Sequence, residues 1–145
     1  MNTKKYLLSD TEREEIIFSV SSVLEKENAV VFGYVHGSFL EGRFNDIDVA
    51  IFVDEDKIPS FLRYELQMES LLNKTVGRFS FDVRILNGAP LSFRYEVIKN
   101  GKLITTRNEE SRVDFETSAC SKYFDFAPFR DSYLKEVLGI GSKQE

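Results

Sequence analysis

Apolar residues recur at two spacings along the first third of the chain, and these predict one helix and two strands. Residues 10–26 carry them at helical spacing, and Ser9 with Glu12 forms the capping-box pattern of a helix N-terminus. Residues 29–35 are rich in β-branched and aromatic side chains, which predicts a buried strand. Residues 46–53 are apolar on both faces apart from two aspartates, as in a central strand. The glycine-containing stretch between the two strands predicts a turn or a short helical start.

The remaining pattern predicts one alternating strand, an edge strand and several helices. Residues 79–86 alternate between apolar and polar, which indicates a strand with one buried face. Gly77 suits the C-terminal cap of the helix before it, and Pro128 is expected to separate the last two helices. The further predicted elements are helices over 57–76, 91–99, about 108–123 and about 130–138, and an edge strand over 102–106. Together they predict an α+β fold, in which a small mixed sheet carries its helices on one face and its catalytic acids on the open face.

The composition fits one soluble domain. The chain has 145 residues, 42% of them hydrophobic, which supplies one core and leaves little room for a second domain. We therefore expect a single domain over residues 1–145, with a helical C-terminal segment from about 108. No stretch approaches the roughly 18–20 apolar residues of a membrane span, and no apolar run of signal-peptide length follows the basic N-terminus. The predicted location is the cytoplasm, without a membrane partner.

Charge and cysteine content argue against other classes of function. The net charge is −5, and an acidic surface argues against direct nucleic-acid binding, because affinity for phosphate backbones comes mainly from Lys and Arg. Cys120 is the only cysteine, so no internal disulfide can form. With His36 as the only histidine, the chain has no set of His and Cys residues for a zinc site. None of these features excludes a nucleotide that is held by metal ions.

Three aspartates in the predicted strands are the candidate catalytic residues. Asp46 and Asp48 are two residues apart, so a strand puts both carboxylates on one face. Two like charges among apolar residues repel each other and resist burial, and a cation removes that cost. Asp82 lies on the polar face of its own strand and joins them if the two strands are neighbours. Three carboxylates can hold two Mg²⁺ ions for phosphoryl or nucleotidyl displacement.

Each candidate also has a plain structural interpretation. Asp46 and Asp48 are solvated acids if they lie at an exposed strand end, although the apolar residues around them favour the metal site. For Asp82, the metal-binding interpretation competes with that of an ordinary strand residue that faces solvent. The N–H groups at Gly37-Ser38 and the serine hydroxyl suit phosphate oxygens, but such a pair is most often only a turn.

Two neighbouring residues keep two interpretations each. Alternation along the strand puts Arg84 on the same face as Asp82. Contact with a triphosphate and a simple ion pair with an acid are equally good interpretations of this arginine. His36 adjoins Gly37, where proton transfer or nucleotide stacking is conceivable, but a structural histidine is the better interpretation.

One motif of the chain resembles that of the DNA polymerase β-type nucleotidyltransferases: Gly37-Ser38, seven further residues, Asp46-Ile47-Asp48, and a later Asp82 on another strand. The short length resembles the minimal nucleotidyltransferase branch of that superfamily. Residues 82–90, 91–97, 101–104 and 123–126 resemble the MntA-type antitoxins of HEPT/MNT toxin–antitoxin pairs. The resemblance covers roughly residues 15–138.

The resemblance implies a polymerase β-like fold and an antitoxin that is a protein adenylyltransferase. Such antitoxins are encoded beside a HEPN-family RNase toxin, and they transfer AMP from ATP to a toxin tyrosine near its active site. Carried over, Asp46 and Asp48 bind both Mg²⁺ ions. Asp82 completes the site for the ion on the nucleophile side and helps to deprotonate the tyrosine. Gly37 and Ser38 hold the β- and γ-phosphates.

Two positions depart from the family's pattern. Phe39 stands where the family commonly has Arg, so a phosphate-side cation is missing unless Arg43 replaces it, and Asn45 stands where Ser is common. Neither change removes a metal ligand. Two alternatives stay open: a catalytically weak binding module that neutralises a toxin sterically, and a nucleotidyltransferase for a small-molecule acceptor. Enzymes of the latter kind usually carry an added substrate domain, and this chain has no room for a large one.

Overall fold

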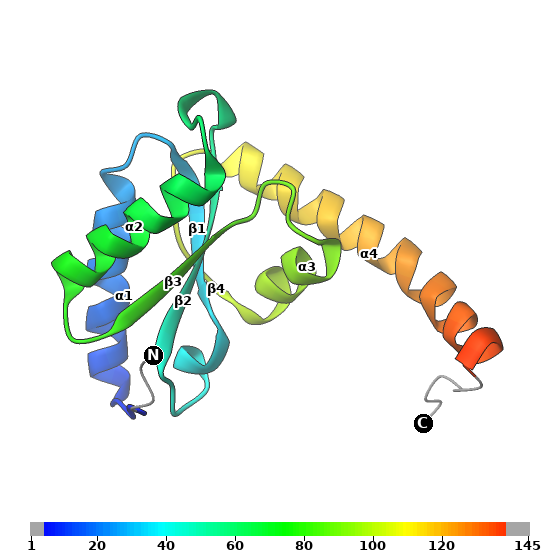
Figure 1. Cartoon of the computed structure of the whole chain (residues 1–145), viewed down its shortest axis with the longest axis horizontal. Coiled ribbons are helices and arrows are strands. Elements are labelled where there is room, and N and C mark those ends of the chain that lie inside the picture. The colour runs from blue at the N-terminus through cyan, green and yellow to red at the C-terminus, as the bar shows by residue number, and fades with distance from the viewer. Residues whose placement is uncertain (1–4, 139–145) are drawn as a thin grey trace.

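The computed structural model describes residues 5–138, and the side chains of residues 5–125. Its helices and strands follow the predicted order, and the turn predicted after the first strand is a short 3-10 helix (Figure 1). The elements are α1 (Asp10–Glu25), β1 (Val30–His36), η1 (Gly37–Leu40), β2 (Asp46–Val53), η2 (Glu55–Lys57), α2 (Phe61–Val76), β3 (Ser80–Ile85), α3 (Leu91–Asn100), β4 (Lys102–Thr106) and α4 (Glu109–Leu138).

Capping residues explain the ends of the first two helices. α1 begins with the predicted capping box, in which the Ser9 hydroxyl accepts the N–H of Glu12 at 3.2 Å and the Glu12 carboxylate accepts the N–H of Ser9 at 2.9 Å. Gly77 ends α2 with a φ of 73°, as predicted. α2 begins later than predicted, at Phe61, because the Ser60 side chain caps its N-terminus.

The predicted separation of two helices at Pro128 is wrong, because α4 runs without interruption from Glu109 to Leu138. A proline lacks a backbone N–H and so removes one helical hydrogen bond, but the turns on both sides remain helical here. α4 extends well beyond the sheet in Figure 1. The C-terminal segment is therefore one long helix, which starts close to the predicted position.

The four strands form one mixed sheet in the order β3-β2-β1-β4. β1 pairs antiparallel with β2 and with β4, which lies at an edge as predicted, and β2 pairs parallel with β3. The parallel register places Asp48 opposite Asp82, and the antiparallel register places His36 opposite Asp48. The sheet thus brings together three polar residues that are far apart in the sequence.

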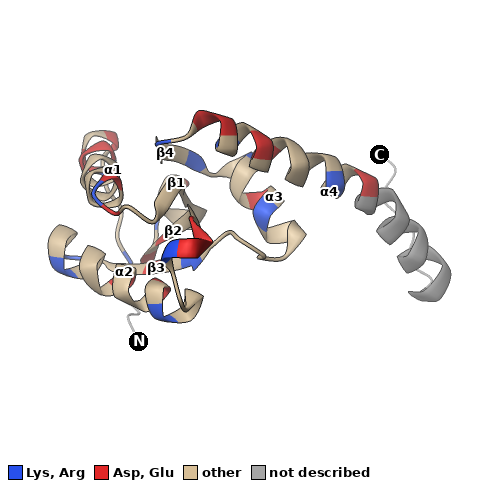
Figure 2. Cartoon of the chain, turned by 90° about the horizontal axis from the view of Figure 1, so that it is seen from above, with Lys and Arg blue, Asp and Glu red and all other residues tan. Residues whose placement is uncertain are grey.

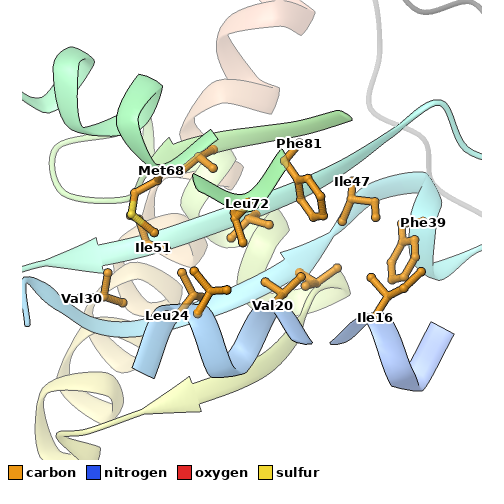
Figure 3. Close-up of a cluster of buried hydrophobic side chains, with 14 of the residues drawn as sticks. Ile16, Val20, Leu24, Val30, Phe39, Ile47, Ile51, Met68, Leu72 and Phe81 are labelled. Carbon is orange, nitrogen blue, oxygen red and sulfur yellow. The ribbon is translucent and has the colours of Figure 1, made fainter. Parts of the chain in front are cut away.

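α1 and α2 cover one face of the sheet, and the larger hydrophobic core lies between them and the strands (Figures 2 and 3). Its members include Ile16, Val20 and Leu24 of α1, Met68 and Leu72 of α2, Val30, Ile47, Ile51 and Phe81 of the strands, and Phe39 of η1. Side chains alternate between the two faces of a strand, so the aspartates of β2 and β3 point to the face opposite this core.

Helices also cover part of the second face, so the prediction of helices on one face is incomplete. The residues packed there are Phe32, Tyr34, Ala50, Phe93, Val97 and Phe115, which come from β1, β2, α3 and α4. The Tyr34 hydroxyl donates to the Glu116 carboxylate at 2.5 Å and ties α4 to the sheet. The second helical layer is needed because β1 is apolar on both faces, and each face must be covered. The N-terminal ends of β2 and β3, with the acids, lie outside this second cluster.

Asn87 closes the end of β2 with its side chain. It is buried, and its Oδ1 accepts the N–H of Val53 at 2.9 Å. Its Nδ2 donates to the Val53 carbonyl at 2.9 Å and to the Glu55 carboxylate at 3.2 Å. The side-chain amide therefore replaces a neighbouring strand for the last residue of β2.

Replacing Asn87 with alanine is expected to lower the free energy of unfolding by about 2–4 kcal/mol, because it leaves the buried N–H and C=O of Val53 without partners. Urea denaturation measures the loss. Asn28→Ala, at an exposed position, is the matched control and should stay within about 0.5 kcal/mol of the unsubstituted protein. Equal stability of the two variants would show that the Asn87 bridge contributes nothing.

Candidate active site

The three predicted aspartates lie close together on one face of the sheet, at the N-terminal ends of β2 and β3. Asp48 is opposite Asp82 in the parallel pair, and Asp46 lies two residues earlier on the same face of β2. Asp46 and Asp82 are exposed, whereas Asp48 is partly buried. The sequence left open whether the strands of Asp48 and Asp82 are neighbours, and the pairing of β2 with β3 shows that they are.

Asp48 is the aspartate whose charge is most disfavoured in this arrangement. Burial, together with the neighbouring charges of Asp82 and Asp46, raises the pKa of its carboxyl to about 6. A carboxylate that burial and like charges both destabilise gains most from a nearby cation. The electrostatics therefore favour binding of a positive ion at this point of the sheet.

Gly37 leaves the space that the Asp48 carboxylate occupies. It follows β1 directly and has a φ of 81°, a backbone conformation that side chains rarely adopt. A Cβ atom at this position would lie 2.4 Å from Oδ2 of Asp48. The positive φ favours glycine, and a Cβ would displace the Asp48 carboxylate from its present position, so the Gly-Ser turn and Asp48 form one unit. Ser38, the next residue, is exposed at the start of η1.

These residues fit a divalent metal ion in the type of donor and in their placement. Hard cations such as Mg²⁺ prefer carboxylate oxygens, and the three carboxylates share one face of two neighbouring strands. Within residues 5–125, however, no three His, Cys, Asp or Glu side chains are already arranged around a common point as metal ligands. Since Asp46 and Asp82 are exposed, their side chains are free to turn toward an ion that Asp48 holds.

The structure explains the phenylalanine after the Gly-Ser pair. Phe39 is fully buried in the core under α1 and packs edge-on against Phe44, with 5.0 Å between the ring centroids. The position therefore serves the core, and no cation stands there. Arg43 is exposed in the loop before β2 and makes no ion pair with any described residue. Its role at the phosphates stays a prediction.

Phe93 of α3 is a neighbour of the site that the sequence did not indicate. The His36 ring packs edge-on against it with 5.5 Å between centroids, and the Arg84 guanidinium lies over it at 4.9 Å. Burial lowers the pKa of His36, and the charge of Asp82 opposes this only in part. The buried Nε2 of His36 has no hydrogen-bond partner among the described residues. Arg84 forms no ion pair there either, which leaves its charge available on the face of the acids.

Glu69 of α2 is a second neighbour that the sequence did not indicate. Its carboxylate accepts the N–H of Val83 at 3.0 Å, and it contacts the carboxyl of Asp82. Burial raises the pKa of Glu69, and its hydrogen bond with Val83 opposes the rise. A signal was present in hindsight, because polar residues 65, 69 and 73 recur every fourth position on one side of α2.

The hollow at the start of α2 is separate from these acids. It has a volume of about 180 Å³ and is lined by Lys57, Arg63 and Gln67 among others. The start of α2 follows the C-terminal end of β2, whereas the acids lie at the N-terminal end. The candidate site is therefore the acidic surface itself.

Comparison with known protein families places this geometry in context. A sequence model described as polymerase beta, nucleotidyltransferase, matches residues 19–110, which include all three aspartates and the Gly-Ser turn. No curated protein matches the chain. In the part of the chain that the structure describes, no helix is long and apolar enough to cross a membrane.

Solved structures show the same fold. A chain of a tri-AMPylated Shewanella oneidensis HEPN toxin in complex with an MNT antitoxin has a TM-score of 0.68 and 16% identity, over 87% of this chain and 98% of that chain. A chain of the MntA-HepT toxin–antitoxin has a TM-score of 0.63 and 16% identity, over 89% of this chain and 99% of that chain. A chain of a toxin–antitoxin with AMP-PNP has a TM-score of 0.64 and 17% identity, over 86% of this chain and 98% of that chain. At such identities the likeness establishes the fold alone.

Proposed function

The chain belongs to the polymerase β nucleotidyltransferase family, and on that premise we propose that it is an antitoxin that transfers AMP from ATP to a tyrosine of a HEPN-family toxin. The observation that carries the proposal is the approach of the Asp48 carboxylate to Gly37, beside Asp46 and Asp82. It joins a turn suited to phosphates with acids suited to Mg²⁺.

In this proposal Asp46, Asp48 and Asp82 hold two Mg²⁺ ions, and Gly37 and Ser38 hold the β- and γ-phosphates of ATP. When bound, the ions stabilise the negative charge that develops on the phosphate oxygens. The backbone N–H groups of the turn suit phosphate oxygens because glycine lets the chain come close to a ligand. Arg84, which is not engaged in an ion pair with any described residue, adds a positive charge on the same face.

The transfer forms one phosphorus–oxygen bond and breaks another. The tyrosine oxygen attacks the α-phosphorus of ATP, the bond to the bridging oxygen of the β-phosphate breaks, and pyrophosphate leaves. The tyrosine proton passes to the carboxylate of Asp82, which is exposed and can face an incoming acceptor. The products are an adenylylated tyrosine and pyrophosphate.

The partner in the proposal is a protein. The structures with the same fold include an AMPylated HEPN toxin with an MNT antitoxin and a toxin–antitoxin with AMP-PNP, which supports ATP and a HEPN toxin as the two substrates. The acidic net charge supports the absence of direct nucleic-acid binding. Action on a cytoplasmic toxin would place the protein in the cytoplasm.

One observation favours a second candidate, a binding module that masks the toxin sterically. Phe39 is buried where the family commonly has a cation, and a site with one phosphate contact fewer holds ATP less tightly. Neutralisation would then need docking alone.

The two candidates differ in their dependence on Asp46. The purified protein is incubated with Mg²⁺, a HEPN toxin and ATP radiolabelled on its α-phosphate. We expect label on the toxin and at least about a hundredfold less with Asp46→Ala. Asp56→Ala, at an exposed position in η2, is the matched control and should label the toxin normally. An Asp46→Ala variant that still silences the toxin without labelling it would establish the steric module instead, and label on a small molecule alone would identify a different acceptor.

A further inference from the structure

The outer edge of β3 is closed by side chains of α2. β3 is the last strand of the sheet on its side, so every second backbone N–H points away from β2. The N–H groups of Phe81, Val83 and Ile85 donate to the side chains of Asn73, Glu69 and Glu65, at 3.1, 3.0 and 2.8 Å. We call these three acceptors the α2 row. They replace the strand that is missing at this edge.

The α2 row works because the repeats of helix and strand match in length. Acceptors four residues apart on a helix are about 6 Å apart along its axis. Donors two residues apart on a strand are about 6.6 Å apart. α2 and β3 run antiparallel in this pairing, since residues 65, 69 and 73 meet residues 85, 83 and 81. Three successive hydrogen bonds therefore form with little strain.

Glu69 is the member of the α2 row that acts next to Asp82. It binds the N–H of Val83, the residue that follows Asp82, and its carboxyl contacts the Asp82 carboxyl. On its other side β3 is held by β2, where Asp82 lies opposite Asp48. Asp82 thus sits on a strand that is fixed by backbone hydrogen bonds on one side and by α2 side chains on the other.

We propose that Glu69 is a positioning residue for Asp82, which fixes the backbone of β3 at Val83 and so keeps the Asp82 carboxylate in register with Asp48. The inference rests on the proposed function, because the register matters through the metal ions that the two aspartates share. Glu69 acts through Asp82 and does not touch the substrate.

Four variants test the inference, with Mn²⁺ as the probe ion and AMP-PNP as the nucleotide. Glu69→Ala removes the acceptor, Glu69→Asp keeps the charge but shortens the side chain by one methylene, and Glu69→Gln keeps an oxygen that accepts from Val83. Glu65→Ala is the matched control, because it removes the same kind of hydrogen bond one step further from Asp82. Binding of Mn²⁺ is measured by titration calorimetry, and exchange of the amide protons by NMR.

We expect Glu69→Ala and Glu69→Asp to weaken Mn²⁺ binding roughly tenfold, the usual effect of losing a group that orients a metal ligand. Glu69→Gln should bind within about twofold of the unsubstituted protein, because the hydrogen bond to Val83 persists. Glu65→Ala should leave Mn²⁺ affinity unchanged while it speeds exchange at Ile85, as Glu69→Ala speeds exchange at Val83.

Unchanged Mn²⁺ affinity in Glu69→Ala and Glu69→Asp, despite faster exchange at Val83, would reduce Glu69 to an edge cap and overturn the inference. Equal weakening by Glu65→Ala would also overturn it, because the effect would then belong to the whole edge. If Glu69→Ala does not fold, Glu69→Asp decides. An unsubstituted protein that binds neither Mn²⁺ nor AMP-PNP would overturn the proposed function and the inference together, which separates that result from the other two.

Discussion

Replacing Asp48 with asparagine is expected to abolish nucleotidyl transfer and, at the same time, to stabilise the metal-free protein above about pH 6. The pKa of Asp48 is raised from 3.8 to about 6, so the folded protein holds this proton more tightly than the unfolded chain. Below the unfolded pKa both states are protonated and there is no cost. The loss of stability begins as the pH rises above the unfolded pKa of 3.8. It is complete above the folded pKa of about 6, where the folded protein must carry the negative charge of Asp48.

The size of the gain in Asp48→Asn follows from that difference. The difference between the folded and unfolded pKa of Asp48 corresponds to a loss of at most about 3 kcal/mol in the free energy of unfolding. Because the carboxylate is partly exposed and solvent screens its charge, we expect Asp48→Asn to recover about 1 kcal/mol. Thermal denaturation in EDTA, at about pH 4 and about pH 8, measures it. Asp114→Asn, at an exposed position on α4, should change stability at neither pH. A variant that keeps its transfer activity, or gains no stability at the higher pH, would contradict the assignment of Asp48 as the disfavoured acid of the site.

Replacing Gly37 with alanine is expected to reduce transfer at least about a hundredfold, because the added methyl group takes the place of the Asp48 carboxylate. The Cβ would lie 2.4 Å from Oδ2 of Asp48, so the acid must turn away from its present position. The positive φ at residue 37 adds a loss of about 1 kcal/mol of stability. Transfer of label from ATP and thermal denaturation report the two effects separately.

Gly88→Ala is the matched control for this substitution. Gly88 has a φ of 71°, close to that of Gly37, and an added Cβ there would meet nothing within 4 Å. It should therefore lose a similar amount of stability and keep its activity. If the two variants lost activity to the same extent, backbone strain rather than contact with Asp48 would be the cause, and the Gly37–Asp48 unit would have no special role.

Short-range patterns were sufficient to predict the strands and the faces that carry the acids. Alternation in 79–86 placed Asp82 on the polar face, and the spacing of Asp46 and Asp48 placed both on one face of β2, as the structure confirms. These predictions depend only on the two-residue period of a strand. Whether β3 lies next to β2 is a property of the whole sheet, so the sequence left it as a condition.

The contacts that support the site could not be predicted in this way. Phe93 reaches His36 and Arg84 from another element, and Glu69 reaches β3 from α2, so both depend on how the layers pack. The second helical layer did have a signal in the sequence, because β1 is apolar on both faces, but which helices supply that layer depends again on how the layers pack. The break expected at Pro128 overestimated the effect of one missing hydrogen bond in a long helix.

The α2 row has a consequence for how this protein meets other chains. A free sheet edge is a template on which a further strand can add, either from a binding partner or from a second copy during aggregation. At β3 the N–H groups that such a strand would need are already occupied by Asn73, Glu69 and Glu65. Strand addition at this edge would first have to displace α2 side chains, so the edge nearest the acids resists self-association. Under the proposed function, an acceptor tyrosine would therefore reach Asp82 across the face of the sheet.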